Sequence, residues 1–503
     1  MKIRITNISA RAVIVTIEGG GKYRSGGKLT VNGSEYFNTV NYIDGLKPVT
    51  EYTAVFEQGG ETMSETFTTA YEFVTLDVRE FGAKGDGETD DTAAIQAAIM
   101  CCPHDSRVLL TGGTYKVTNI FLKSSIVFEI AEGASLLADN IREHHSILPG
   151  MITSYDEKDE YNLGTWEGNP LKSFAGIITG IDVENIVICG RGTVFGNATH
   201  QDWWHDEKRM NIAFRPRLLF LSHCKNVVVA GLLFKNSPSW TIHPYFSENV
   251  KLIDFTINNP ADSPNTDGID VESCSNVEIA GIHFHLGDDC IAIKSGKIYM
   301  GRKYHTPAKH IHIHDCLCEN GHGAVTVGSE ISGGVDDVVV ENCLFVDTDR
   351  GLRIKTRRGR GKLSVIDGVV FRNIEMKGVK TPFVANAFYF CDPDGRTSYV
   401  QDRAPHPVDD TTPKIKRLVF EDITAVDCHY AAAFFMGLPE SPIEVIEMKN
   451  VDIRFHEHPG SGYAAMLCGI EPMSGYGIFA ENVEKLILDN VTIDGAAAES
   501  PLG

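Results

Sequence analysis

The chain has 503 residues, which is too long for one compact core and suggests either several domains or one long array of repeats. Its hydrophobic share of 43% and charged share of 22% are ordinary for a globular protein, and a net charge of −21 argues against a nucleic acid partner. No stretch reaches the ~18 uninterrupted apolar residues of a membrane span, and the first residues lack the apolar run of a signal peptide. We therefore expect a cytoplasmic protein with reduced cysteines, in which an anionic substrate would need local cations.

Residues 1–72 are predicted to form a separate all-β unit. Short alternating stretches around Val13 and Val55 are separated by glycine-rich turns, a pattern typical of antiparallel strands. The segment 46–52, which ends at Tyr52, resembles the tyrosine corner of fibronectin type III domains, in which the hydroxyl contacts upstream backbone. We expect a small β-sandwich that supports the main domain or forms its rim; a carbohydrate-binding role is the alternative.

From residue 75 to residue 495 the pattern predicts a parallel β-helix. Residues 90–99 combine an acidic start with apolar positions at helical spacing, which predicts a helix that caps one end of the solenoid. A motif of asparagine followed by alternating apolar residues, called the asparagine phrase below, then recurs at intervals typical of β-helix coils. It begins at Asn185, Asn226, Asn249 and Asn276.

Other segments depart from this repeat. Residues 156–170 and 392–413 are polar insertions that are expected to form loops beside a site, and residues 496–503 are expected to be a disordered tail. Cys224 and Cys274 each lie two residues before an Asn-Val pair, which predicts thiols stacked inside the coils. A metal cluster is disfavoured because no paired C-x-x-C ligands occur.

Three carboxylates carry the strongest chemical signal: Asp267, Asp288 and Asp289. The offset of 288 − 267 = 21 positions is about one coil, and stacked strands lie ~4.8 Å apart, so the three acids should converge. Both adjacent acids can face outward only where the strand bends, which Gly287 permits. One protonated acid beside ionised neighbours can protonate a leaving oxygen while the neighbours activate water. Turn capping by Asp289 or Asp270 is the simpler alternative.

Cations follow the acids at spacings of about one coil. Arg353 and Lys355 are two residues apart and share a strand face, which predicts a clamp for a substrate carboxylate. The remaining cations of this run, from Arg358 onward, are interpreted as a solvated loop. Trp240 lies one coil before Asp267, where it would either stack on a sugar ring or pack in the protein.

Three histidines, at positions 310, 312 and 314, alternate with isoleucines. A metal site is one interpretation. The favoured one is a strand that packs isoleucine inside the coil and turns histidine toward solvent, because no nearby acid has obvious ligand spacing.

Four blocks of this sequence together resemble the signature of glycoside hydrolase family 28, the polygalacturonases. They are Asn265-Thr266-Asp267, Gly287-Asp288-Asp289, Gly321-His322-Gly323 and Arg353-Ile354-Lys355. The resemblance extends from about Thr75 to the C-terminus. It implies an all-β fold, a right-handed parallel β-helix, and hydrolysis of galacturonic acid linkages with inversion and without metal or cofactor.

The same resemblance implies roles for individual residues. Asp288 would be the general acid, Asp267 and Asp289 would hold and activate the water, and His322 would orient the acid. The substrate-binding set would comprise Arg353, Lys355, Asn265 and Tyr389, with Trp240 as a further candidate.

The closer likeness is to bacterial exo-acting members, some of which carry a fibronectin-like N-terminal domain. We therefore expect an enzyme that removes galacturonic acid from the ends of oligogalacturonides, with the two insertions closing one end of the groove. Three alternatives stay open: a family member that acts on rhamnogalacturonan, xylogalacturonan or another plant glycoside, a calcium-dependent lyase, and a non-catalytic β-helix that binds glycans.

Overall fold

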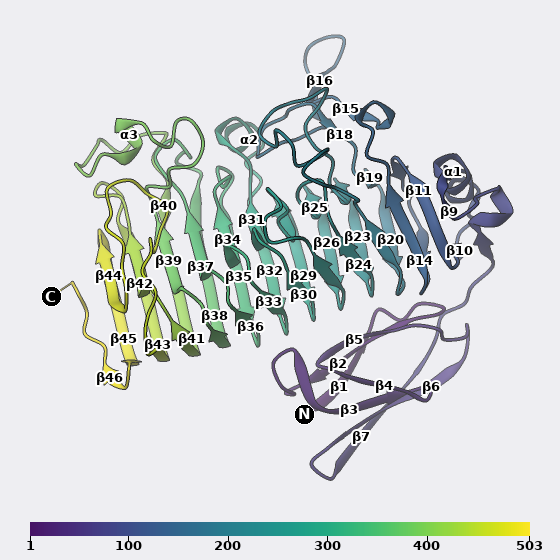
Figure 1. Ribbon diagram of the computed structural model, residues 1–503, viewed down its shortest axis with the longest axis horizontal. Coiled ribbons are helices and arrows are strands. Elements are labelled where there is room, and N and C mark those ends of the chain that lie inside the picture. The colour runs from purple at the N-terminus through teal and green to yellow at the C-terminus, as the bar shows by residue number, and fades with distance from the viewer. Residues whose placement is uncertain (503) are drawn as a thin grey trace.

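The computed structural model describes residues 1–502, and strands dominate it (Figure 1). A small unit at the N-terminus leads into one long solenoid of parallel strands, with helices and loops along one side. None of the described helices is long and apolar enough to cross a membrane.

The N-terminal unit is a small sandwich of two antiparallel sheets. One sheet contains β1 (Lys2–Thr6), β2 (Val13–Glu18) and β5 (Val40–Ile43), and the other contains β3 (Arg24–Val31), β4 (Ser34–Asn38), β6 (Glu51–Gln58) and β7 (Glu61–Thr68). Apolar side chains of both sheets, such as Val15 and Phe56, share one core. The Tyr52 hydroxyl accepts a hydrogen bond from the Lys47 amide at 2.9 Å, which confirms the predicted contact with upstream backbone. The likeness to fibronectin type III stays a prediction.

The solenoid is a right-handed parallel β-helix, as predicted. Its sheet of eleven strands comprises β12 (Ile120–Phe121), β19 (Ile178–Ile181), β22 (Leu219–Ser222), β25 (Ile242–Tyr245), β28 (Ile269–Glu272), β31 (Asp289–Lys294), β34 (Gly323–Gly328), β37 (Arg350–Lys355), β39 (Thr381–Asn386), β42 (Ala431–Met436) and β44 (Tyr476–Glu481).

A second, larger sheet forms the rest of the coil wall. Its strands are β8 (Thr75–Asp77), β9 (Asp86–Asp90), β10 (Arg107–Leu110), β11 (Gly113–Val117), β13 (Ile126–Ile130), β14 (Ala134–Ala138), β20 (Glu184–Cys189), β21 (Thr193–Phe195), β23 (Lys225–Ala230), β24 (Leu233–Lys235), β26 (Glu248–Ile253), β27 (Thr256–Asn258), β29 (Ser275–Ala280), β30 (His283–His285), β32 (Ala308–His314), β33 (Leu317–Glu319), β35 (Val335–Glu341), β36 (Leu344–Val346), β38 (Val365–Lys377), β40 (Lys414–Ile415), β41 (Arg417–Cys428), β43 (Ile443–Phe455), β45 (Val483–Ile493) and β46 (Ala496–Ala497).

The repeated asparagines form a ladder along the outside of the coils. The side chain of Asn226 donates to Asn185 at 3.0 Å, Asn249 donates to Asn226 at 3.0 Å, and Asn276 donates to Asn249 at 3.2 Å. Each has a positive φ between 55° and 58°, a conformation that asparagine tolerates better than most residues. The asparagine phrase therefore turns the chain and stacks it at once.

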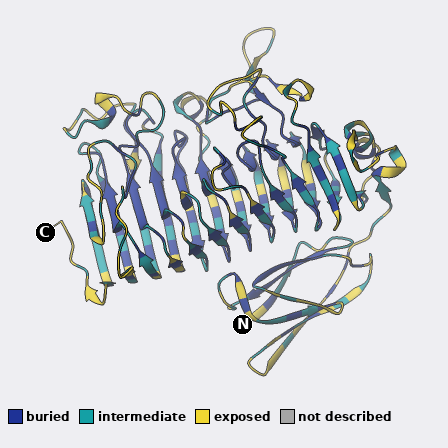
Figure 2. Ribbon diagram, viewed as in Figure 1, coloured by how far each residue is buried: buried dark blue, intermediate teal, exposed yellow. Residues whose placement is uncertain are grey.

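Apolar side chains fill the interior of the coils. Figure 2 shows that residues along the solenoid strands are largely buried. Residues facing inward recur in register, so that Val227, Val250 and Val277 of successive coils lie side by side. Cys224 and Cys274 lie fully buried in this core, and all twelve cysteines are free. The prediction that these thiols are buried is confirmed. Ser247 lies between them in the stack of coils, since its hydroxyl accepts from the Cys224 amide and its amide donates to the Cys274 sulfur.

The two ends of the solenoid are covered differently (Figure 1). Helix α1 (Thr92–Cys101) buries Ile95, Ala98 and Ile99 against the first coils, as predicted for a cap. At the other end β46 turns back and pairs antiparallel with the end of β45. The expectation of a disordered tail is therefore wrong at Ala496 and Ala497, where backbone pairing holds the chain; Gly503 lies outside the described residues.

The N-terminal unit packs against the outer face of the larger sheet. Val40 and Tyr42 contact Ala230 and Ala280 there. His314 lies beside this contact and is only 4% exposed, with its ring nitrogens near Asp315 and Glu278. The prediction that this histidine faces solvent is therefore wrong, because it did not include the cover that the first unit provides. The isoleucines of the same strand do pack inside the coil.

Insertions rise from the eleven-stranded sheet on the opposite side (Figure 1). They comprise the short strands β15 (Ile147–Leu148), β16 (Met151–Thr153), β17 (Glu160–Asn162) and β18 (Ser173–Phe174), and the helices α2 (Ile298–Tyr304) and α3 (Ser398–Gln401). Two 3-10 helices, η1 (Val78–Phe81) and η2 (Arg142–His144), lie near the first coils. These insertions enclose the surface on which the predicted site lies.

Candidate active site

Three carboxylates meet at one place on the eleven-stranded sheet. One oxygen from each of Asp267, Asp288 and Asp289 lies within 4.8 Å of the others. The coils explain this meeting, because the amide of Gly268 donates to the carbonyl of Asp289 at 2.9 Å and the amide of His322 donates to the carbonyl of Asp288 at 2.9 Å. The predicted convergence is confirmed; the roles of the three acids stay predictions.

Both adjacent acids line the same cavity, which requires the backbone to bend before β31. Gly287 lies so close to the preceding coil that a Cβ atom there would come within 1.9 Å of the Ala261 carbonyl oxygen. Only glycine fits this approach. Gly287 therefore permits the bend that presents Asp288 and Asp289 together.

Asp289 is held between two cations. Its carboxylate accepts from the Arg353 guanidinium at 2.9 Å and from the Lys355 ammonium at 2.7 Å. Burial raises the pKa of Asp289, but the charges of Lys355 and Arg353 outweigh burial and lower that pKa far below its usual range. Two positive charges against one negative charge leave a positive surplus that can bind a substrate carboxylate.

Asp288 is paired with a histidine. The Nδ1 atom of His322 lies 3.3 Å from Asp288 Oδ1, and that oxygen also accepts from the amide of Asp289 at 2.9 Å. Burial raises the pKa of Asp288, whereas the hydrogen bond from His322 and the charge of Lys355 together lower it below its usual value. The contact with Asp288 in turn raises the pKa of His322.

Asp267 lies in the opposite environment. Its side chain is almost fully buried and no cation contacts it directly. Burial, together with the negative charges of Asp288 and Asp270, raises the pKa of Asp267 well above its usual value. One member of the group thus keeps its proton to higher pH, as predicted, although without substrate that member is Asp267 and not Asp288.

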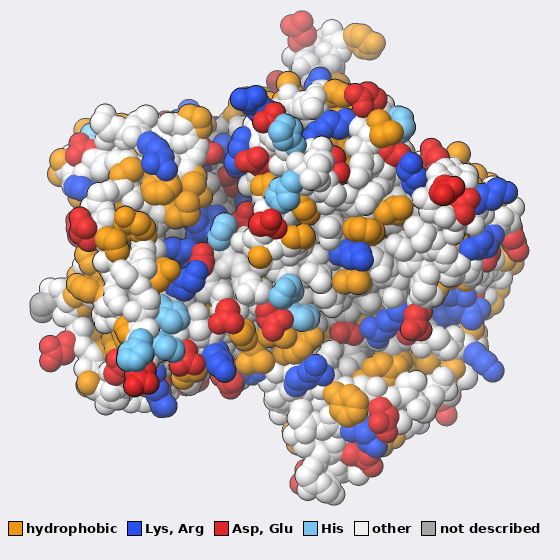
Figure 3. Space-filling model, in the orientation of Figure 1, with side chains coloured by type: hydrophobic (Ala, Val, Ile, Leu, Met, Phe, Trp, Pro, Cys, Tyr) orange, Lys and Arg blue, Asp and Glu red, His pale blue; other side chains and the backbone are white. Residues whose placement is uncertain are grey.

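The acids open into a cavity of about 310 Å³. Figure 3 shows charged side chains of both signs gathered where the surface is hollowed between the loops around α3 and β16. The lining includes every predicted site residue: Asp267, Asp288, Asp289, His322, Arg353, Lys355, Asn265, Tyr389 and Trp240. A cavity of this size accommodates a sugar ring and part of its neighbour.

The predicted binding residues differ in how free they are. Asn265 has a positive φ of 54°, and its side-chain oxygen accepts from Arg215 at 2.9 Å. Tyr389 is 8% exposed, with the Lys355 ammonium 5.5 Å from its ring centre. Trp240 is 4% exposed, and the Lys294 ammonium lies 4.4 Å from its ring centre, so packing occupies much of this ring.

A buried ion network behind the acids was not predicted. Lys294 lies 3.1 Å from Glu330 and 3.4 Å from Asp270, and all three side chains are less than 9% exposed. In the sheet, Lys294 is aligned with Glu272 of the preceding coil. The sequence shows Lys294 only as the end of an apolar strand, so nothing local indicates that its partners lie on other coils.

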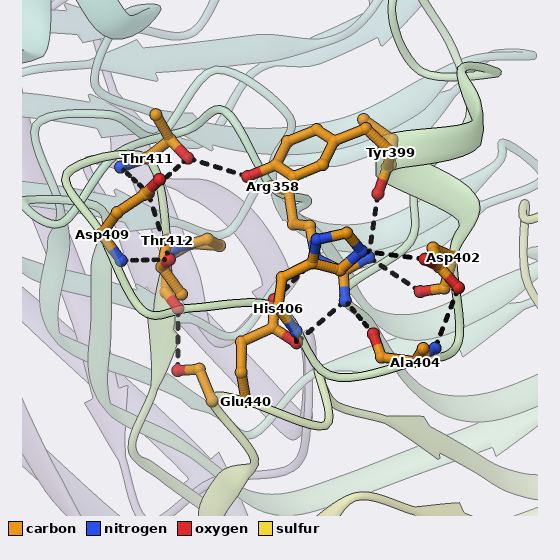
Figure 4. A network of polar contacts seen from close by, with 12 residues as sticks. Arg358, Tyr399, Asp402, Ala404, His406, Asp409, Thr411, Thr412 and Glu440 are labelled. Carbon is orange, nitrogen blue, oxygen red and sulfur yellow. Dashed lines mark hydrogen bonds and ion pairs between the residues drawn. The ribbon is translucent and has the colours of Figure 1, made fainter.

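Arg358 and Arg360 are buried, which corrects the prediction of a solvated loop for these two residues, whereas Lys362, with 64% of its side chain exposed, is solvated as predicted. Arg358 donates to both carboxylate oxygens of Glu440, at 2.6 and 2.8 Å, and to the carbonyl of Tyr399 at 3.0 Å (Figure 4). Arg357 and Arg360 contact Asp392. These arginines fix the insertion 392–413 over the sheet, because their partners come from distant coils and from the insertion itself.

Three segments form the walls of the cavity. Glu167 lines it from the insertion 156–170, and Asp392 lines it from the insertion 392–413. A third segment, residues 463–468, crosses the sheet beyond Arg353 and is called the strap below. Its carbonyl at Met466 accepts from Asn386 at 3.0 Å, and its carbonyl at Tyr463 accepts from Arg350 at 2.8 Å. The strap carries no motif in the sequence and was not predicted.

The three acids also have the geometry of a cation site. Both oxygens of Asp289 are already paired with Arg353 and Lys355, however, and these positive charges repel a second cation. The arrangement therefore suits acid–base chemistry with a water molecule better than it suits metal binding.

Comparison with known proteins agrees with this geometry. The model of glycosyl hydrolases family 28 matches residues 150–461, and a model named rhamnogalacturonase A/epimerase, pectate lyase-like, matches residues 75–129. A probable polygalacturonase of Vitis vinifera is 30% identical over 383 residues, covering 74% of this chain and 73% of its own. An exo-poly-alpha-D-galacturonosidase of Dickeya chrysanthemi is 26% identical over 422 residues, covering 76% of this chain and 69% of its own.

Solved structures share the fold. A family 28 exopolygalacturonase of Yersinia enterocolitica aligns over 99% of this chain and 100% of its own, with a TM-score of 0.71 and 19% identity. An exopolygalacturonase of Thermotoga maritima aligns over 84% of this chain and 92% of its own, with a TM-score of 0.66 and 24% identity. Since the family model spans most of the solenoid, including all four blocks that supply the acids and cations, the chain belongs to glycosyl hydrolase family 28, the polygalacturonase family.

Proposed function

We propose that the protein is an inverting exo-polygalacturonase that releases galacturonic acid from the ends of oligogalacturonides. One observation carries this proposal: three carboxylates converge in a walled cavity beside Arg353 and Lys355. The acids supply proton transfer, and the cations supply affinity for a uronate. The substrate is thus an anionic oligosaccharide, which the positive surplus attracts into a chain of net charge −21.

In the proposed reaction, protonated Asp288 donates its proton to the oxygen that leaves with the rest of the chain. A water molecule attacks the anomeric carbon from the opposite face while the bond to that oxygen breaks. Asp267 or Asp289 accepts the proton of the water, so that the products are galacturonic acid and a shortened oligomer. His322 orients the Asp288 carboxyl through the contact at 3.3 Å.

The low pKa of Asp288 in the free protein needs an explanation, because the acid must be protonated. The positive charge of Lys355 is one cause of the low value. A uronate carboxylate bound at Lys355 cancels much of that charge, and it therefore raises the pKa of Asp288. Substrate binding would in this way move the proton toward the group that uses it.

The walls support an exo mode of action. The strap crosses the sheet beyond Arg353, and the turn that carries Glu167 is held over the sheet by the hydrogen bond from the Lys297 amide to the Gly168 carbonyl and by the stacking of Trp166 on Trp240. A polymer that ran through the site would need both ends open. The exo-acting relative of Dickeya chrysanthemi is consistent with this mode, at 26% identity.

Product analysis tests the proposal. Trigalacturonate and polygalacturonate are digested side by side, and early products are separated by anion-exchange chromatography. We expect galacturonic acid as the sole early small product from both, with the initial anomer inverted in an NMR time course. A ladder of oligomers from the polymer would contradict the exo mode, and an ultraviolet-absorbing unsaturated product would indicate a lyase.

Another pectic substrate is the second candidate. The match of residues 75–129 to a rhamnogalacturonase-type model is the observation that favours it. Those residues form the first coils and the α1 cap, away from the acids. Digests of rhamnogalacturonan and xylogalacturonan, run with the same preparation, separate this candidate from the first. Residence in the cytoplasm stays a prediction that cell fractionation can check.

A further inference from the structure

The cavity contains more acidic than basic side chains, and its cations are unequally available. Acids that line it include Glu167, Asp288, Asp349 and Asp392 in addition to the buried ones. An anionic oligosaccharide is attracted to such a cavity only where a cation can reach it. Besides the surplus charge of Arg353 and Lys355 over Asp289, a cation that solvent reaches can bind a further carboxylate of the substrate.

Four of the five lysine and arginine side chains that line the cavity are buried and already paired. Arg353 and Lys355 pair with Asp289, and Lys294 pairs with Glu330. Arg350 donates to two carbonyls of the strap and to Asp349. The side chains of these four are 5–9% exposed.

Lys208 is the exception among the described residues that line the cavity. Its side chain is 61% exposed, and its one ion-pair partner is Glu167 at 3.1 Å. Burial lowers the pKa of Lys208, but the charge of Glu167 and, further along, that of Asp288 raise it. Lys208 and Asp288 line the same cavity.

The segment that carries Lys208 is anchored. It connects β21 to β22, and Trp203 and Trp204 within it are buried. The indole of Trp204 donates to the Ser237 carbonyl at 3.0 Å, and the Arg142 guanidinium lies 4.4 Å from the ring centre of Trp203. These contacts anchor the segment that carries Lys208.

The two groups of cations come from opposite directions along the solenoid. The segment with Lys208 precedes β22, three coils before β31, whereas Arg353 and Lys355 lie on β37, two coils after it. The acids lie between them. A disaccharide whose scissile bond lies over the acids would place one ring toward Lys208 and the other toward Arg353 and Lys355.

We propose that Lys208 binds the carboxylate of the uronate across the scissile bond from the one held by Arg353 and Lys355. The site would then select a pair of consecutive uronates, and Glu167 would hold the ammonium ready until the substrate displaces it. This inference rests on the proposed function, since it takes the substrate to be a galacturonide.

Binding to an inactive variant tests the inference. In an Asp288→Asn background, calorimetry compares digalacturonate with two disaccharides in which one or the other carboxyl is reduced to the alcohol. We expect Lys208→Met to weaken binding of digalacturonate by about 10-fold, as for loss of a charge-assisted contact. The same substitution should weaken binding by less than about 2-fold for the disaccharide whose reduced carboxyl is the one that Lys208 would bind. The comparison is a double-mutant cycle between protein and ligand.

Matched variants sharpen the result. Lys208→Arg keeps the charge and should restore most of the affinity. Lys158, which is 79% exposed and pairs with Asp156 on the β16–β17 hairpin, lies outside the cavity, so Lys158→Met should change no affinity. Glu167→Gln removes the competing carboxylate and should strengthen binding of digalacturonate about 2-fold.

The possible outcomes distinguish failure of the inference about Lys208 from failure of the proposed function. An equal effect of Lys208→Met on all three disaccharides, or none on any, overturns the inference while leaving the proposed function intact. Failure of the protein with Asp288 restored to hydrolyse digalacturonate at all overturns the proposed function, and the inference fails with it.

Discussion

Two histidine–aspartate contacts on the same solenoid have opposite surroundings. His322 lies 3.3 Å from Asp288 at the open cavity, with its side chain 50% exposed. His314 lies 2.7 Å from Asp315 beneath the N-terminal unit, with its side chain 5% exposed. The contact itself does not indicate chemistry. The first pair has two further acids, two cations and the walled cavity beside it, whereas the second is covered by the N-terminal unit and has Glu278 as a further acidic neighbour. We therefore expect a catalytic role for the first pair and a structural role for the second.

The largest effect is expected at the first pair, where a substitution of Asp288 should change the rate and not the stability. Asp288→Asn removes the acidic proton and should lower kcat by about 10³-fold, a loss of roughly 4 kcal/mol of transition-state stabilisation. Initial rates on trigalacturonate measure the effect, and the midpoint of urea unfolding serves as the control. Turnover equal to that of the wild type would remove Asp288 from the mechanism.

The second pair should control stability through pH. Burial lowers the pKa of His314, but Asp315 and Glu278 outweigh burial and raise that pKa to about 9. A raised pKa stabilises the fold fully below the unfolded value of about 6.5, and this stabilisation is lost as pH rises through about 9. The full difference corresponds to roughly 3 kcal/mol.

Unfolding in urea at pH 6 and pH 9.5 measures this contribution. His314→Gln should destabilise the protein strongly at pH 6 and much less at pH 9.5, with little change in the rate on trigalacturonate. His310, which pairs with Asp337 at an exposed position, provides the matched control, and His310→Gln should have a small effect at both pH values. Equal losses at both pH values for His314→Gln would show that packing, not charge, explains its role.

A smaller effect is expected at the partner of the catalytic acid. His322→Gln should lower kcat by roughly 10-fold while leaving unfolding in urea unchanged, because half of this side chain is already exposed. Loss of the imidazolium also removes one cause of the low pKa of Asp288, so the alkaline limb of the rate profile should move to higher pH. If His322→Gln lowered the free energy of unfolding without moving the alkaline limb, His322 would have a structural role like that of His314.

The smallest effect provides a baseline outside both regions. Asn249→Ala breaks two contacts of the asparagine ladder at a positive φ of 56°, and it should cost about 1 kcal/mol of the free energy of unfolding at any pH. Urea unfolding at two pH values checks this. A pH-dependent loss here would mean that the result for His314 does not report on its charge.

Much of this architecture could be predicted because it is local in the sequence. The asparagine phrase and the alternation of apolar residues specify the coils, and a spacing of one coil brings Asp267 beside Asp289. Gly287 indicates the bend in the sequence, although the close approach to Ala261 that requires glycine there is seen only in the structure.

The rest depends on partners that are far apart in the chain. Arg358 follows other cations and was interpreted as solvated, yet its carboxylate partner, Glu440, lies 82 residues later. Lys294 and Glu330 meet only because successive coils stack. The strap is held in place by Arg350, which donates to its Tyr463 carbonyl. His314 was misjudged because its cover comes from a different unit of the protein.

The difference between the two ends of the solenoid affects whether strands of separate copies of this protein can pair with each other. One side of β45 pairs with β43, and within the described chain β46 and Ala498 after it cover the other side at Val491, Thr492 and Ile493. The remaining amide and carbonyl groups of that rim form a template onto which a foreign strand could add. Exposed Glu484, Lys485 and Asp489 interrupt the rim with charge, which discourages fibre-like growth from the last winding.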